Sequence, residues 1–198
     1  MPTTRNKKRP GVELFRNKTG LCIIDIQEHL AAAMPEKVLK GTLRNCLNLI
    51  EAARVLELPV VVTEQYPKGL GRTLPVIAEA VLRLPREQIF FFEKIVFGCK
   101  GLGPFDGWLK KSKRTQWIVA GMETHICVFQ TARALVGEGY DVHVPRDAVI
   151  SRAMANWEVG LRLMEQCQVV VSATEVAVFD LLKQAGTEEF KLLSHIVK

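Results

Sequence analysis

Short apolar runs alternate along this chain with longer segments in which apolar residues recur every three to four positions. The runs predict strands at residues 21–26, 60–63, 89–92, 116–120, 142–144 and 169–171. The periodic segments predict helices at residues 36–57, 75–84, 105–111, 127–136, 153–166 and 176–184. Because the runs are apolar on both faces and helices separate them, the pattern predicts a three-layer α/β/α fold around a six-stranded, mainly parallel, Rossmann-like sheet.

Length and composition favour a single folded domain. The 198 residues are 48% apolar and 24% charged, close to the globular average, which excludes disorder as the main state. We expect a flexible basic leader at residues 1–18 and one domain at residues 19–198. No apolar stretch reaches the roughly 18 residues of a membrane span, and the first 20 residues lack the apolar centre of a secretory signal. We therefore expect a cytoplasmic protein with no membrane partner, while the basic N-terminus leaves organelle targeting open.

The positive charge is concentrated at the N-terminus. The formal net charge is +6, from 27 Lys and Arg against 21 Asp and Glu. Six basic residues and one acidic residue fall within residues 1–20, so the other 178 residues carry 21 basic and 20 acidic groups. A nucleic-acid-binding fold spreads its positive charge over a folded face. The distribution argues against a nucleic-acid partner, and the basic cluster at residues 5–9 is either a solvated tail or an arm that contacts phosphate.

Cysteine and histidine spacing argues against a disulfide framework and a metal site. The five cysteines form no Cys-x-x-Cys pair, and free cysteine is usually a small buried hydrophobic residue. The four histidines lack the close spacing of zinc ligands. The cysteines are Cys22, Cys46, Cys99, Cys127 and Cys167, and the histidines are His29, His125, His143 and His195. We expect neither a metal nor a cofactor.

One cysteine, Cys127, follows a predicted strand and the turn at Gly121, and stands at the start of the predicted helix 127–136. The free N–H groups and the dipole of a helix N-terminus favour an anion, so this position is expected to lower the thiol pKa and favour thiolate. The same N–H groups suit the oxyanion of a tetrahedral intermediate. The sequence therefore indicates Cys127 as a nucleophile, with simple core packing as the alternative.

Two charged residues end apolar strands and are expected at the same edge of the sheet. Asp25 follows the run at residues 21–24, and Lys94 follows the run at residues 89–92. Ligands of open α/β sheets bind beyond the carboxyl ends of the strands, where both side chains would meet Cys127. A partly desolvated Asp25 would act as a base, and the Lys94 ammonium would offset its charge and favour thiolate. The alternative is a structural ion pair.

Three motifs together resemble the isochorismatase-like cysteine hydrolase superfamily, which includes nicotinamidases and N-carbamoylsarcosine amidases. They are Asp25 in Asp-Ile-Gln, Lys94 in Glu-Lys, and Cys127 in Gly-Met-Glu-Thr-His-Ile-Cys, in the order and at the spacing of the family's Asp-Lys-Cys triad. The segments at residues 63–71 and 125–131, Asp147 with Ser151-Arg152, and the closing Phe190-Lys191 resemble its isochorismatase-domain subgroup. The similarity covers most of the chain from Leu21 onward.

The resemblance implies a mechanism. Cys127 would attack a carbonyl or related carbon, Asp25 would take the thiol proton and pass it to the leaving group, and Lys94 would support the thiolate. The peptide bond between Met122 and Glu123 would be cis, and the backbone N–H groups of Glu123 and Cys127 would form the oxyanion hole. The family also commonly assembles as homo-oligomers.

Side chains beside the triad are expected to shape a pocket for a small-molecule substrate. They are Gln27, Gln65, Tyr66, Phe97, Cys99, Thr124 and His125. For His125 a packed or capping role is the equal alternative. Nicotinamidases bind a metal through an Asp-x-His motif, whereas the corresponding loop here reads Thr-Glu-Gln-Tyr-Pro at residues 63–67. This departure removes the metal that would anchor nicotinamide.

The leading hypothesis is a metal-independent cysteine hydrolase acting on a small amide, ester or related molecule through a covalent cysteinyl intermediate. Two alternatives come from other classes of function. One is a catalytically idle family member that serves as an interaction scaffold. The other is a nucleic-acid-binding protein or ribonuclease that uses the basic leader. Enol-ether chemistry, the reaction of isochorismatase itself, has no support in these motifs.

Overall fold

The computed structural model describes residues 11–197, and within them seven parallel strands form one sheet. The strands are β1 (Thr19–Ile24), β2 (Val60–Gln65), β3 (Ile89–Lys94), β4 (Gln116–Met122), β5 (Asp141–Pro145), β6 (Val149–Ile150) and β7 (Val170–Ser172). Their order is β3-β2-β1-β4-β5-β7, and β6 pairs with the end of β4. The order reverses between β1 and β4, and such a switch point is where an open α/β sheet offers a binding crevice.

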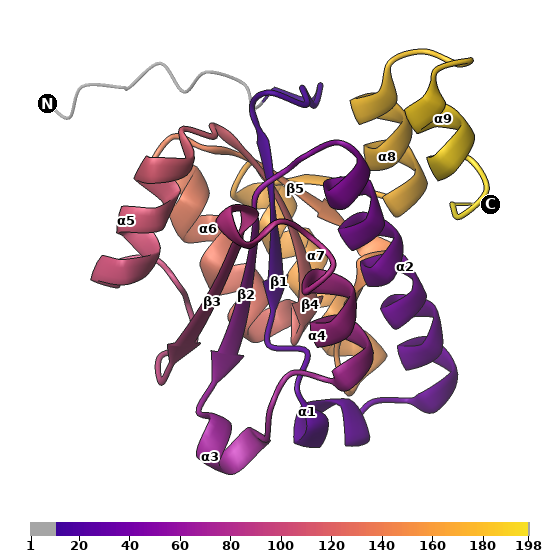
Figure 1. Ribbon diagram of the computed structural model, residues 1–198. Coiled ribbons are helices and arrows are strands. Elements are labelled where there is room, and N and C mark those ends of the chain that lie inside the picture. The colour runs from indigo at the N-terminus through magenta and orange to yellow at the C-terminus, as the bar shows by residue number, and fades with distance from the viewer. Residues whose placement is uncertain (1–10, 198) are drawn as a thin grey trace, which may run out of the picture.

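Helices cover both faces of the sheet (Figure 1). One layer holds α2 (Glu36–Val55), α4 (Pro75–Val81), α8 (Thr174–Leu182) and α9 (Glu188–Leu193), and the other holds α5 (Gly103–Ser112), α6 (Phe129–Gly137) and α7 (Met154–Gln166). The short helices α1 (Glu28–Ala32) and α3 (Pro67–Leu70) lie at the carboxyl edge of the sheet. No helix within residues 11–197 is long and apolar enough to cross a membrane.

Alternate residues of the central strands enter two separate cores. In β1, Leu21 and Ile23 join the cluster that includes α2 and α4, whereas Cys22 and Ile24 join the cluster that includes α5 and α6. All four side chains are at most 1% exposed. Burial on both faces explains why such a strand has an unbroken apolar sequence, and it confirms the predicted three-layer α/β/α fold.

Two details of the sheet differ from the prediction, although all six predicted strands form. The pattern of apolar runs misses β6, because two residues carry no recognisable period. The pattern also predicts that β3 is covered on both faces, but β3 is an edge strand. Phe90 and Phe92 pack with Trp108 and Phe105 on one face, whereas Phe91 on the other face is 44% exposed.

The N-terminal segment is packed over much of the length that the sequence predicts to be a flexible leader. The Gly11 N–H donates to Asp141 Oδ1 at 3.0 Å, and the Leu14 N–H donates to Asp180 Oδ2 at 2.6 Å. The Leu14 side chain is 1% exposed within the core. The predicted leader of residues 1–18 is therefore wrong for residues 11–18, because an apolar side chain holds this segment to the domain. Residues 1–10, with the basic cluster, lie outside the described part of the chain.

Gly121 in β4 permits the close approach of the two central strands. Its φ is +120°, and a Cβ atom there would lie 2.0 Å from the Ile24 carbonyl oxygen of β1. We expect Gly121→Ala to lower the free energy of unfolding by about 3 kcal/mol, because the backbone of a central strand has to move. Urea unfolding measures the loss. Gly137→Ala in α6 is the control, since an added Cβ there meets nothing within 4 Å, and an equal loss in both variants contradicts the argument.

Candidate active site

Asp25 and Lys94 form a fully buried ion pair at the carboxyl edge of the sheet. Asp25 directly follows β1, and Lys94 is the last residue of β3, which lies two strands away. The Lys94 Nζ atom is 2.6 Å from Asp25 Oδ2, and both side chains are 0% exposed. Because Lys94 pairs with Gln65 of β2 and Ile24 pairs with Thr63, the lysine reaches across β2 to meet the carboxylate.

Several groups fix the orientation of the Asp25 carboxylate. The Thr63 hydroxyl of β2 donates to Asp25 Oδ1 at 2.6 Å, and the Asp25 N–H donates to the Thr63 carbonyl at 3.1 Å. The chain leaves β1 at Asp25 in a left-handed conformation with φ of +49°. The carboxylate also lies near enough to the Cys127 thiol to raise its pKa. Asp25 is thus bonded to a hydroxyl and an ammonium, and it lies near a thiol.

The Lys94 ammonium is held by the loop that follows β3. Besides Asp25, it donates to the Phe97 carbonyl at 3.0 Å and contacts the Val96 carbonyl at 3.4 Å. These backbone acceptors compensate for the loss of water around a buried cation. The side chains of this loop face outward, and Phe97 is 52% exposed.

Cys127 lies within a short helical turn rather than at its first residue. A π-helical turn covers Thr124–Val128, and α6 continues from Phe129, so the predicted helix start at residue 127 is about one turn too late. The Glu123 carbonyl accepts hydrogen bonds from the N–H groups of Ile126 at 3.1 Å and Val128 at 3.2 Å. Cys127 is 6% exposed. The turn therefore holds its thiol inward, toward Asp25.

The peptide bond before this turn has an uncommon form. The Met122–Glu123 peptide bond is cis, the form that the family resemblance implies. It lies directly before the turn that holds Cys127.

The electrostatics of the thiol differ from the expectation that Cys127 rests as thiolate. Burial raises the pKa of the Cys127 thiol well above its usual range, the Asp25 carboxylate raises it further, and Lys94 opposes the rise only in part. The expectation of a lowered pKa is therefore wrong, because the thiol lies inside the protein beside a carboxylate rather than at an open helix end.

The raised thiol pKa predicts a characteristic pH dependence. Because thiolate is the alkylating species, the rate of Cys127 alkylation by iodoacetamide is expected to rise roughly tenfold per pH unit between about pH 7 and pH 9. Peptide mass spectrometry at each pH measures this rate. Cys167, the one free cysteine of residues 11–197 that is not buried, is the internal reference for an accessible thiol. A Cys127 rate that reaches its plateau by neutral pH contradicts the prediction.

Two of the predicted pocket residues have their polar atoms already partnered. Gln27 is 0% exposed; its amide donates to the carbonyls of Gln65 at 3.1 Å and Gly71 at 2.7 Å, and its carbonyl accepts from the Gln65 N–H at 2.7 Å. Cys99 is also 0% exposed and hydrogen-bonds with Thr131 at 3.3 Å. Burial raises the pKa of the Cys99 thiol to about 11. Gln27 therefore holds the loop after β2, and Cys99 holds the loop after β3 against α6.

The other predicted pocket residues lie on the loops after β2 and β3 and in the turn that holds Cys127. Tyr66 is 50% exposed, and its N–H donates to the Lys94 carbonyl at 2.7 Å, which joins the loop after β2 to the end of β3. Gln65 donates to the Ile95 carbonyl at 3.0 Å. In the turn that holds Cys127, the buried Thr124 hydroxyl has no protein partner among the described residues. His125 Nδ1 is hydrogen-bonded to Ser151 Oγ at 3.0 Å.

The sequence did not predict that Ser151 and Arg152 contact the segment before Cys127. The Arg152 N–H donates to the Glu123 carboxylate at 3.0 Å, and its guanidinium Nε lies 3.1 Å from the same group. With the His125–Ser151 contact, residues 151–152 hold two residues, Glu123 and His125, that lie just before Cys127. The family resemblance includes Ser151-Arg152, but only the fold shows what these residues contact. The contact of Thr63 with Asp25 could have been expected from the sequence, because Thr63 is a polar residue at the end of an apolar run.

The donor set of the described chain does not form a metal site. Within residues 11–197, no group of three His, Cys, Asp or Glu side chains is arranged to hold a metal ion. His29 Nδ1 is instead hydrogen-bonded to the Gly69 carbonyl at 2.7 Å.

The fold and the site define the class of protein: a three-layer α/β/α domain with a buried Asp25–Lys94 ion pair near Cys127 at the carboxyl edge of a parallel sheet. The family model of the isochorismatase domain matches residues 19–176. The chain belongs to the isochorismatase family, whose members share this hydrolase-type fold.

Individual relatives agree with this assignment. The secreted isochorismatase effector Isc1 of Phytophthora sojae is 34% identical over 196 residues, which cover 96% of this chain and 89% of that protein. A solved structure described as MAR1 ribonuclease from Caenorhabditis elegans has a TM-score of 0.85 at 31% identity, covering 93% of this chain and 92% of that chain. The YcaC gene product of Escherichia coli is described as an octameric hydrolase of unknown specificity. It has a TM-score of 0.82 at 20% identity, and the match covers 96% of this chain and 92% of that chain.

Proposed function

We propose that this protein is a metal-independent cysteine hydrolase that acts on a small amide, ester or related carbonyl compound. The observation that carries the proposal is the buried contact of Asp25 with both Lys94 and Cys127. A buried ion pair costs desolvation energy, and hydrophobic residues of similar volume would often replace it at no loss of stability. Stability alone therefore does not explain this pair, whereas a carboxylate beside a thiol can act as the base that deprotonates it.

The raised thiol pKa matches a mechanism in which Asp25 is the base. As Cys127 Sγ attacks the carbonyl carbon, its proton moves to Asp25, and the carbonyl oxygen becomes an oxyanion held by the N–H groups of Glu123 and Cys127. Collapse breaks the bond to the leaving group, which takes the proton from Asp25. Water then attacks the thioester, Asp25 accepts a water proton, and that proton returns to sulfur when the acid product leaves.

Lys94 has a steady electrostatic role in this cycle. Its ammonium stays within 2.6 Å of Asp25 and offsets the carboxylate charge whenever the proton is elsewhere. It also opposes the rise in thiol pKa, which makes sulfur easier to deprotonate. The exposed rings of Tyr66 and Phe97 suit a small substrate with an apolar part.

A covalent adduct tests the proposal. We expect incubation with a small library of amides, esters and aldehydes to give a mass increment on the Cys127 peptide with at least one member, together with release of the leaving group from that member. The idle-scaffold alternative predicts the opposite, since its cysteine would form no adduct beyond that of an ordinary buried thiol. Absence of an adduct and of turnover across the library contradicts the hydrolase proposal.

Ribonuclease activity is the second candidate function. It is favoured by the name of the Caenorhabditis elegans structure, which is 31% identical to this chain. The nearly balanced charge of residues 21–198 offers little attraction to a phosphate backbone. A labelled RNA added to the library assay decides between the two: cleavage that persists in Cys127→Ser assigns it to another site, and cleavage lost in this variant makes RNA a substrate of the triad.

We further propose that the protein forms a homo-oligomer and works in the cytoplasm. The YcaC product of similar fold is described as octameric, which supports assembly. All five cysteines are free, which suits a reducing compartment, whereas the Phytophthora sojae relative is described as secreted. Light scattering on the purified chain measures the subunit number.

A further inference from the structure

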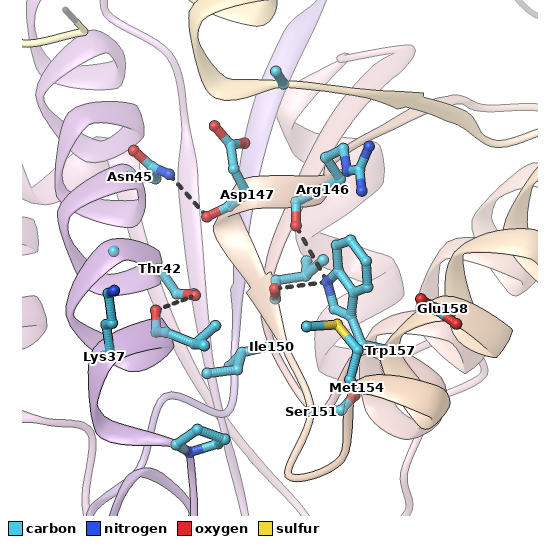
Figure 2. Close-up of a pocket in the computed structure, with 15 residues that line it drawn as sticks. Lys37, Thr42, Asn45, Arg146, Asp147, Ile150, Ser151, Met154, Trp157 and Glu158 are labelled. Carbon is cyan, nitrogen blue, oxygen red and sulfur yellow. Dashed lines mark hydrogen bonds between the residues drawn. The ribbon is translucent and has the colours of Figure 1, made fainter.

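A cavity of about 660 Å³ lies apart from the triad, between α2 and the segment that runs from β5 to α7. Figure 2 shows its two walls: Thr42 and Asn45 project from α2, and Ile150, Met154 and Trp157 face them. None of Asp25, Lys94 and Cys127 lines it. Its volume is that of a pocket for a small organic molecule.

The α2 wall of this cavity is left open by a glycine. Gly41 lines the cavity in the interior of a 20-residue helix, and a Cβ atom added there would meet nothing within 4 Å. Glycine inside a helix costs about 1 kcal/mol relative to alanine. Since no neighbouring atom excludes alanine, the missing side chain is not required by packing and leaves room beside the helix.

The opposite wall is flat, apolar and held in place. The Trp157 indole N–H lies within hydrogen-bonding distance of the carbonyls of Arg146 at 3.2 Å and Val149 at 3.1 Å, and the Arg146 guanidinium lies 4.9 Å from the ring centroid on a cation–π contact. These contacts fix the ring. Ile150 is 1% exposed and Met154 is 63% exposed, so apolar surface runs from the interior to the mouth. The ring of an aromatic ligand would pack face to face or edge to face against such a wall.

The mouth of the cavity carries an unpaired cation. Lys37 lies in the first turn of α2, and among residues 11–197 no carboxylate forms an ion pair with it. Nearby acidic groups are directed elsewhere: Asp147 Oδ1 accepts from the Thr174 N–H at 2.8 Å, and in Figure 2 the Glu158 carboxylate lies beyond Trp157 as seen from Lys37. An acidic group on a bound molecule would therefore find Lys37 without a competing partner.

We propose that this cavity binds a flat, mostly apolar molecule with one acidic group, such as an aromatic carboxylate, at a site separate from the triad. The apolar part lies between Gly41 and the wall formed by Ile150, Met154 and Trp157. The acidic group pairs with Lys37 at the mouth. This inference does not depend on the proposed hydrolase function.

Titration calorimetry with two probes of the same ring tests the proposal: 2-naphthoate, and the uncharged 2-naphthalenemethanol. The full chain is expected to bind one equivalent of 2-naphthoate. Gly41→Leu fills the cavity and is expected to weaken binding at least tenfold, and Gly41→Ala to weaken it less. Gly107→Leu in α5 is the matched control, because its added Cβ also meets nothing within 4 Å, and it is expected to bind as the unchanged protein does.

Two further variants separate charge from shape and this site from the triad. Lys37→Gln is expected to weaken 2-naphthoate binding about fivefold and to leave 2-naphthalenemethanol unaffected. Cys127→Ser is expected to bind 2-naphthoate unchanged, and this result holds whether or not the protein is a hydrolase. Failure of 2-naphthoate to bind, unchanged binding in both Gly41 variants, equal loss in Gly107→Leu, unchanged binding in Lys37→Gln, or loss in Cys127→Ser would each overturn the proposal.

Discussion

Cys127→Ser is expected to abolish the covalent adduct and to reduce hydrolysis of any substrate found by at least about a thousandfold. A serine hydroxyl is a far weaker nucleophile than sulfur, and the carboxylate beside it is too weak a base to activate it. The substitution is nearly isosteric at a 6% exposed position, so the fold is expected to remain. Turnover and peptide mass spectra on the same samples measure both effects.

Cys167→Ser is the matched control for this experiment. Cys167 follows α7 and is partly exposed, and the proposed mechanism gives it no role. It is expected to retain turnover and the adduct on Cys127. If hydrolysis survives in Cys127→Ser, sulfur is not the nucleophile, and the mechanism proposed above is wrong.

Asp25→Asn is expected to lower the free energy of unfolding by about 3–5 kcal/mol, because it leaves the Lys94 ammonium buried without its counter-ion. Both side chains are fully buried, so solvent does not screen the loss. The same variant removes the base and is expected to remove turnover. Urea unfolding at neutral pH measures the stability change.

The double variant Asp25→Asn/Lys94→Met distinguishes structure from chemistry. Removing the cation as well is expected to recover most of the lost stability, since no charge is then left buried alone. Turnover is expected to stay absent. If the double variant is as unstable as the single one, the cost arises from something other than the unpaired ammonium. If turnover returns with stability, the pair is structural and Asp25 is not the base.

The sequence predicted the meeting of Asp25 and Lys94 because polar residues interrupt an otherwise apolar pattern at strand ends. Each follows an apolar run, and parallel strands present their carboxyl ends at one edge of the sheet. The buried ion pair between them agrees with this expectation. Cys127 was located by the turn after β4 and by the family motif. The structure shows the Asp25–Lys94 ion pair and places both groups near enough to Cys127 to shift its thiol pKa. The reactive roles of the three residues stay a proposal.

The sequence misjudged features that depend on burial and on distant contacts. A helix start alone favours thiolate, but the depth of Cys127 and its carboxylate neighbour raise the thiol pKa instead. Residues 11–18 resemble a loose leader by charge, yet Leu14 is buried in the core. Gln27 was expected in the pocket wall, whereas its side-chain amide is hydrogen-bonded to backbone atoms of Gln65 and Gly71.

The sequence by itself determined the layered α/β/α fold, the family and the candidates for the reactive side chains, because periodicity and strand ends are local properties of a chain. Only the tertiary structure decided the direction of the thiol pKa shift, the contacts of residues 151–152 with Glu123 and His125, and the cavity beside Gly41. Those features depend on which atoms from distant segments surround a group. The local pattern of residues does not specify those neighbours.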